Sequence, residues 1–384
     1  MSTTIVVQPE LIRWARSRVG FSEERLAHEM KLKDASVVNQ WETSGELTMS
    51  QLEKIAQKTH TPIGYMFLPV PPVERLPIPD FRVLAGASAL KPSPNLLDAV
   101  NQCQFRQSWL REYLISEGAE PLVFVGSEHE QSDPLRVAGE IREAIAFNSS
   151  ERSAARTWED ALRLLVAGIE QAGVTVMRSG IVGNNTHRKL DVFEFRGFCL
   201  SDKYAPLIFI NSADAVSAQM FTLAHELAHV WIGRSGVSDT SVRSDVATEA
   251  FCNRVAAEIL VPTGEFAESW QTGADPVGLA GRLSRQFKVS ALVVLIRAYQ
   301  SGFLGYDEFR ILYDAERGKS FERTASGGGD FYRTQGSRLG KRFIRSVVGS
   351  TLEGRITYTE AFQLLGVKKS STFNSLAASA FGGT

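Results

Sequence analysis

The stretch FTLAHELAHVWIG at residues 221–233 decides the expected fold. It contains the pattern HExxH, in which His225 and His229 are four residues apart. On an α-helix with 3.6 residues per turn, side chains at this spacing lie on one face, so both imidazoles can bind one metal ion. Glu226 follows the first histidine, where its carboxylate can take a proton from water at that metal. The alternative is a hydrogen-bonded polar cluster that holds no metal.

A metal held by two imidazoles needs a third protein ligand. Zinc suits two neutral imidazoles and a carboxylate, with a fourth position for water. The next predicted helix, ATEAFCNRVAAEIL, carries Glu249 twenty residues after His229, which allows a loop and an antiparallel helix to return to the metal. Glu258 is the competing carboxylate, but it falls on a different side of that helix. Cys252 is set aside, because a lone buried cysteine usually acts as a small hydrophobic residue.

Length and composition limit the class of protein. A chain of 384 residues exceeds one ordinary domain, and 43% hydrophobic with 22% charged residues suffice for a folded core. The net charge of −1 excludes a polybasic protein of nucleic acid or membrane surfaces as a description of the whole. Three dispersed cysteines predict no disulfide framework and indicate a reducing cytoplasm. We find no signal peptide and no run of eighteen apolar residues, so we expect neither secretion nor a membrane span.

The order of helix and turn signals predicts a multi-domain, mainly α chain with a small β-sheet. Residues 1–70 are expected to form an all-α helix-turn-helix bundle, and five prolines within 68–80 predict a proline-rich linker over 71–94. Residues 95–317 would form an α+β zincin-like metallopeptidase domain with a helical insert. Residues 318–384 would form a basic helical C-terminal extension.

Local signals place the elements of these parts. Pro9, Ser22 and Asp34 predict the starts of three helices, and 49–58 and 63–67 supply two more. Short β-branched and aromatic runs predict strands of a small sheet before the HExxH helix. These runs are VTVMRSG at 174–180, DVFEFRGFCL at 191–200 and PLIFIN at 206–211.

HELAH, followed by E-x-x-x-N-x-x-A-A-E-x-L-x-P from Glu249, resembles the ImmA/IrrE family of zinc-dependent metallopeptidases. The resemblance implies that His225, His229 and Glu249 hold zinc. It also implies that Glu226 acts as general base and then proton donor while water attacks a peptide carbonyl. A further donor would stabilise the oxyanion. Tyr204 and His187 are both open candidates for that donor.

The resemblance extends to the longer members of this group over nearly the whole chain. It includes RGFCLSD…PLIFIN at 196–211, LPIPDFR at 76–82 and the C-terminal FYR…RLGKRF…GRITYTEAFQLLGVK. These members are gene regulators, and their peptidases cleave or remove repressors in stress, phage or mobile-element responses. The resemblance therefore implies a repressor-type or toxin-like protein substrate. The alternative is a non-catalytic DNA-binding repressor, or an antitoxin of a toxin-antitoxin pair, that retains a zincin-like domain.

RSRVGFSEERLAHEM…SVVNQWETSGELT resembles an XRE-type helix-turn-helix. Ser36, Asn39 and Gln40 are the candidates for contacts with base edges, and Arg25 and Lys33 are candidates for phosphate contacts. Residues 1–70 nevertheless hold eight basic and eight acidic residues, so the module alone should attract DNA weakly. Either a homodimer doubles the contacts, or the module binds protein.

The C-terminal part has the opposite charge balance. Residues 318–384 hold ten basic and four acidic residues, a net charge of +6. EAFQLLGVKKSSTFNSL also has the pattern of a helix, a turn and a second helix. This end can therefore supply phosphate contacts that the front lacks, or it can simply present a solvated basic face.

Overall fold

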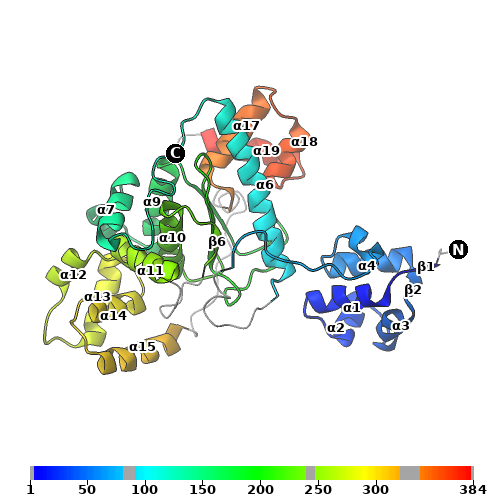
Figure 1. Cartoon of the computed structure of the whole chain (residues 1–384), viewed down its shortest axis with the longest axis horizontal. Helices are drawn as coiled ribbons and strands as arrows, with labels where there is room; N and C mark the ends of the chain where they lie inside the picture. The colour runs from blue at the N-terminus through cyan, green and yellow to red at the C-terminus, as the bar shows by residue number, and fades with distance from the viewer. Residues whose placement is uncertain (1–3, 81–90, 239–246, 321–337, 382–384) are drawn as a thin grey trace. The chain divides into compact units, whose positions relative to one another are not determined.

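The computed structural model describes residues 4–80, 91–238, 247–320 and 338–381 (Figure 1). The chain divides into two compact units, each described by itself below. The first unit comprises Met1–Pro77 and Ala89–Val100, and the second comprises Ile78–Ser88 and Asn101–Thr384. Helices predominate and the sheets are small, which confirms the expected fold class.

The first unit is a bundle of short helices around one apolar core. Its helices are α1 (Pro9–Arg18), α2 (Glu23–Met30), α3 (Ser36–Ser44), α4 (Met49–Lys58) and the 3₁₀ helix η1 (Ile63–Phe67). Pro9 occupies the first turn of α1, and the Ser22 hydroxyl accepts a hydrogen bond from the Arg25 N–H at 3.1 Å, as the sequence predicts. Asp34 lies one residue before the cap of α3, which is Ala35.

The bundle also contains a strand pair that the all-α prediction left out. Strand β1 (Thr4–Val6) pairs in antiparallel fashion with β2 (Glu46–Thr48), and Ile5 lies opposite Leu47. The β-branched run Thr4-Ile5-Val6 is a strand signal, but three residues are too few to predict a pairing across forty positions. The pair joins the start of the chain to the loop after α3.

Two arginines of the first unit are held by buried or half-buried carboxylates. Arg16 Nε and Nη2 lie 2.5 and 2.8 Å from the two oxygens of Glu42, whose side chain is 2% exposed. Arg18 Nε and Nη2 lie 2.6 and 2.7 Å from the oxygens of Glu74. Because Glu74 lies in the predicted linker, the first part of that segment packs on the bundle.

A four-stranded mixed sheet forms the centre of the second unit. Its strands are β3 (Thr175–Ser179), β4 (Gly197–Leu200), β5 (Leu207–Asn211) and β6 (Gly236–Val237), in the order β3-β5-β4-β6. β3 and β5 are parallel, whereas β4 is antiparallel to both β5 and β6. Of the predicted strand 191–200 only the last four residues pair, and the short β6 was not predicted.

Helices make up most of the rest of the second unit (Figure 1). They include α7 (Pro134–Ala144), α8 (Ser149–Ala154), α9 (Trp158–Gln171), α10 (Val216–Trp231), α11 (Ala247–Leu260), α12 (Thr263–Ser269), α13 (Pro276–Phe287), α14 (Ala291–Gln300) and α15 (Tyr306–Ser320). α10 packs against β4, β5, α9 and α11, and it is buried at nearly every position from its second turn onward. α6 spans Pro94–Ser116. No helix in the described ranges is long and apolar enough to cross a membrane.

The C-terminal extension forms a three-helix group of α17 (Lys341–Leu352), α18 (Tyr358–Leu365) and α19 (Ser370–Phe381). Phe343 packs edge-on against Trp109 of α6 at a centroid distance of 5.8 Å. Arg345 Nε donates to the Ala380 carbonyl at 2.7 Å, and Arg355 pairs with Glu117. Part of the basic charge of this extension is therefore used inside the fold.

Candidate metal centre

Two neighbouring helices bring the predicted ligands together. His225 and His229 lie on one face of α10, and Glu249 lies in the first turn of α11, all three buried. His225 Nε2 is 3.2 Å from Glu249 Oε2, and His229 Nε2 is 3.1 Å from Glu249 Oε1. The two Nε2 atoms are 3.1 Å apart. Within the described residues this is the one group of three histidine, cysteine or acidic side chains with metal-binding geometry.

The spacing of these nitrogen and oxygen atoms suits a small tetrahedral ion. Ligand atoms about 2.0–2.1 Å from a tetrahedral zinc are separated by about 3.3 Å, close to the observed 3.1–3.2 Å. The donor set of two imidazoles and one carboxylate is also the set that zinc prefers. The residues present therefore fit a zinc ion.

Asn253 orients the first histidine. Its Oδ1 lies 2.9 Å from His225 Nδ1, and since an amide oxygen only accepts, Nδ1 carries the proton. Nε2 then keeps its lone pair and faces Glu249. Asn253 follows Glu249 by one turn of α11, so one helix supplies both the third ligand candidate and the residue that sets the tautomer of the first.

Glu226 lies next to the cluster with no exposed surface. Ser238 Oγ donates a hydrogen bond to its Oε2 at 3.1 Å. The other oxygen, Oε1, has no hydrogen-bond partner among the described residues. Gly197, the first residue of β4, brings its backbone close to this carboxylate: a Cβ there would be 3.2 Å from Oε1.

Burial governs the protonation of the site. It raises the pKa of Glu226 well above its usual range, and the nearby Glu249 carboxylate raises it further. Burial also raises the pKa of Glu249, but the close contacts of its carboxylate with the His225 and His229 imidazoles outweigh this effect and lower the pKa to about 2. Burial lowers the pKa of His229 and so favours the neutral imidazole, the form that binds metals.

The other residues considered as metal ligands or as the oxyanion donor lie elsewhere or make other contacts. Glu258 accepts from the Thr263 hydroxyl at 2.7 Å and pairs with Arg297 at 3.1 Å. Cys252 is buried near the carboxylates, but it is not in the three-residue group. His187 is exposed and Tyr204 is half-buried, and no described contact joins either side chain to the group.

The predicted DNA contacts are all exposed. Ser36, Asn39 and Gln40 lie on α3, Arg25 lies on α2, and Lys33 lies between the two helices. Arg25 pairs with Glu29 one turn on at 2.9 Å, with 59% of its side chain exposed. All five positions are accessible to a partner.

Comparison with protein families bears on the second unit. Residues 169–299 match the family model Peptidase M78, described as the IrrE N-terminal-like domain. The match covers the sheet, both helices of the cluster and the helices up to α14. It supports the ImmA/IrrE resemblance. Residues 339–379 match a domain of unknown function, DUF8813, which coincides with the three-helix extension. No protein with a curated description matches the chain.

Three neighbours of the cluster have roles that sequence reasoning did not assign. The i,i+4 spacing placed Asn253 on the face of Glu249, but nothing in the sequence paired it with His225. Ser238 and Gly197 approach Glu226 from a loop and a strand, 12 and 29 residues away in sequence. Only the fold brings these residues to the carboxylate.

The Gly197→Ala variant tests the close approach of β4 to α10. The added Cβ would lie 2.7 Å from Thr222 Cγ2 and 3.0 Å from the Phe209 carbonyl oxygen, so the strand or helix must shift. We expect the free energy of unfolding to fall by about 1–3 kcal/mol, measured by urea denaturation. Gly281→Ala is the control, because its Cβ would meet open space on α13, and it should leave stability unchanged or raise it by about 1 kcal/mol. Equal stability of the two variants would contradict the packing argument.

Proposed function

We propose that this chain is a zinc-dependent metallo-endopeptidase joined to a DNA-binding-type regulatory module. Its substrate would be a repressor-type protein, cleaved or controlled in a stress, phage or mobile-element response. The observation that carries the proposal is the buried triangle of His225, His229 and Glu249 with the Glu226 carboxylate beside it. The family match over residues 169–299 supports the same assignment. The free, buried cysteines agree with the proposed cytoplasmic location.

Different residues of the chain would bind the metal, orient a ligand and transfer the proton during hydrolysis. His225, His229 and Glu249 would hold zinc, and Asn253 would keep the His225 proton on Nδ1. When bound, zinc acts as a Lewis acid that polarises a peptide carbonyl and makes water more acidic. Ser238 holds Glu226 through Oε2, which leaves Oε1 to receive a proton from the attacking water and pass it to the leaving amine.

Metal analysis tests the proposed ligands. Purified protein should hold one zinc per chain by mass spectrometry, and His225→Ala should lose it. Asn253→Ala should retain the ligands but bind zinc about 10–100-fold more weakly in a chelator competition, because the imidazole is no longer oriented. Glu258→Gln serves as the matched control on the same helix and should bind zinc normally. Absence of zinc from the wild-type chain would overturn the assignment.

The Glu226→Gln variant separates the peptidase from the alternative, a non-catalytic repressor or antitoxin that uses the site structurally. Glutamine keeps the size of the side chain but cannot take the proton, so proteolysis should fall by at least about 10³-fold. Zinc content and thermal unfolding should stay at wild-type values. A variant that retains full biological activity would favour the non-catalytic function.

We also propose that the first unit binds DNA as a homodimer. The arrangement of α2 and α3, with Ser36, Asn39 and Gln40 exposed on α3, favours this function. Arg16 and Arg18 are engaged with Glu42 and Glu74, so few cations are free for phosphates. Protein binding by the same face is the competing interpretation, and the basic extension is a second source of phosphate contacts.

Salt dependence of DNA binding measures how many phosphates the protein contacts. With Arg25 and Lys33 from each of two copies, the slope of log K against log salt should be roughly −4 for the gene's own upstream DNA in a mobility-shift titration. The double variant Arg25→Ala and Lys33→Ala should flatten this slope, whereas Lys203→Ala in the second unit should not. A slope near zero for the wild-type chain would favour protein binding.

A further inference from the structure

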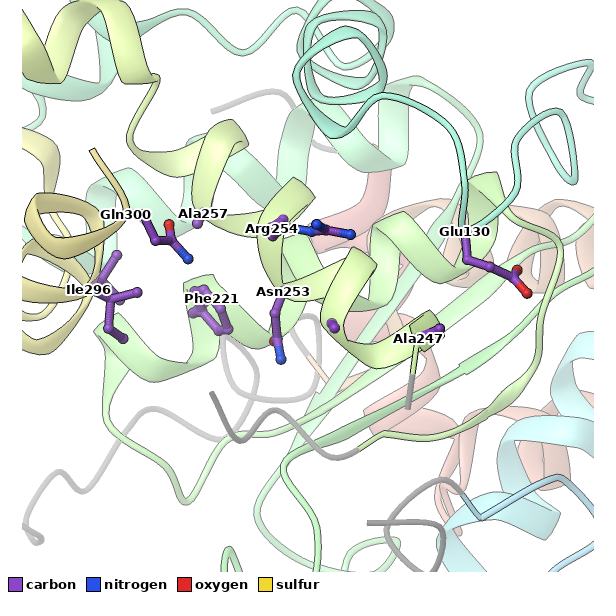
Figure 2. A pocket seen from close by; sticks show the side chains of 10 residues that line it. Glu130, Phe221, Ala247, Asn253, Arg254, Ala257, Ile296 and Gln300 are labelled. Carbon is purple, nitrogen blue, oxygen red and sulfur yellow. The ribbon is translucent and has the colours of Figure 1, made fainter. Parts of the chain in front are cut away.

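The metal centre is closed in the described conformation. His225, Glu226 and Glu249 have no exposed surface, and His229 is 1% exposed. The pocket of about 280 Å³ shown in Figure 2 is lined by Asn253 but by none of these four residues. It therefore gives a peptide no access to the cluster. A peptidase with this centre must open before a substrate can bind.

One edge of the sheet lies next to this centre. β6 pairs with β4, and Val237 lies opposite Phe198. The residues adjoining that pair, Ser238 and Gly197, both approach Glu226. The other edge strand, β3, is separated from β6 by β5 and β4. The edge of the sheet nearest to the centre is therefore the outer edge of β6.

The end of the linker occupies that edge. The Val237 N–H donates to the Pro79 carbonyl at 2.9 Å, and Asp80 forms a parallel bridge with Val237. Ile78 is buried, with 8% of its surface exposed. Residues 78–80, here called the strap, belong to the second unit, so the contact lies within that unit. An extended segment commonly adds to a sheet at such an edge, and here the protein's own chain takes the place.

The sequence LPIPD at 76–80 suits a strand that can be released. Pro77 and Pro79 favour extended backbone at their own positions and at the residues before them. Because proline has no N–H, they also leave the strap with few donors for a neighbouring strand. Ile78 supplies a buried side chain and Pro79 an acceptor. An attachment of three residues is small enough to open without unfolding the sheet.

The strap continues the chain from the first unit. Within that unit Glu74 accepts from Arg18 Nε and Nη2 at 2.6 and 2.7 Å. Only three residues, 75–77, separate Glu74 from Ile78 in the chain. A displacement of Glu74 would therefore be passed to the strap through a short stretch of backbone.

We propose that the strap is an autoinhibitory strand of the peptidase. While it is paired with Val237 it holds β6 in place, and β6 keeps Ser238 on Glu226. Its release would free β6 and open the metal centre. The proposal rests on the peptidase function above.

Hydrogen exchange of the full chain tests the pairing directly, because the Val237 N–H donates to Pro79. By mass spectrometry this amide should be protected in the wild type and exchange at least about tenfold faster in Ile78→Asp, which places a charge at a buried position. Val73→Asp is the control, since 81% of Val73 is exposed in the same linker, and it should not change the exchange. Strand β3 should stay protected in both variants. An unprotected Val237 amide in the wild type would overturn the proposal.

Cleavage of unfolded casein and loss of zinc to EDTA test the consequence. If the open state of the wild type is a minor one, Ile78→Asp should raise both rates about ten- to a hundredfold. Ile78→Ala, which should also fold where the aspartate variant does not, should raise both rates by a smaller factor. The synthetic peptide ERLPIPD, residues 74–80, added at millimolar concentration should restore slow rates to Ile78→Asp. The same peptide with aspartate in place of isoleucine should not.

The outcomes separate the strap from the peptidase. Faster exchange at Val237 with unchanged cleavage and zinc loss, in chains that are all active, would overturn autoinhibition and leave the peptidase intact. Faster zinc loss from Ile78→Asp, with no cleavage by any chain, would overturn the peptidase and leave the strap as a cover of the metal centre.

Discussion

The second unit buries two carboxylates that interact electrostatically, those of Glu226 and Glu249, and the surrounding structure depends on this constraint. Buried charges are costly unless they are paired and hydrogen-bonded. In the described part of the chain neither is paired with a lysine or arginine; Glu249 faces two imidazoles and Glu226 faces a serine. A divalent cation held by the histidines and Glu249, as proposed, would supply the missing positive charge. The all-round burial of α10, the glycine on β4 and the position of Asn253 are all conditions for holding these groups in place.

The same rule of pairing explains why net charge is a poor guide to the partners of this protein. The first unit contains as many acidic as basic residues, and Arg16 and Arg18 are held by carboxylates within it. In the extension, Arg345 donates to a backbone carbonyl and Arg355 pairs with Glu117. Charges that count toward a basic total are thus already used to join helices. A charge total therefore overstates what these parts offer to a partner, and the salt dependence of binding is the informative quantity for the proposed DNA contacts.

Local elements were predictable where one short stretch of chain specifies them. The helices at 49–58 and 63–67 have the predicted limits, and the serine cap of α2 is where the sequence places it. Predictions were incomplete where strands pair with partners distant in sequence. The pairing of β1 with β2 and the two-residue strand β6 were not predicted, and residues 191–196, predicted as part of a strand, form the loop before β4. A strand of two or three residues has almost no signal of its own, because partners distant in sequence determine whether it forms.

The sequence by itself determined which residue types meet at the candidate metal centre. HExxH on a helix places two imidazoles on one face, and a glutamate twenty residues later can return to them on the next helix. Both features can be predicted because they depend only on helical geometry and on the length of chain between the residues. Tertiary structure alone decided the rest. It placed Asn253 against His225 and Ser238 against Glu226. It also paired Glu258 with Arg297 and formed a pocket between α10, α11 and α14. Such contacts join residues from separate elements, and their distances are set by how those elements pack, which no local pattern specifies.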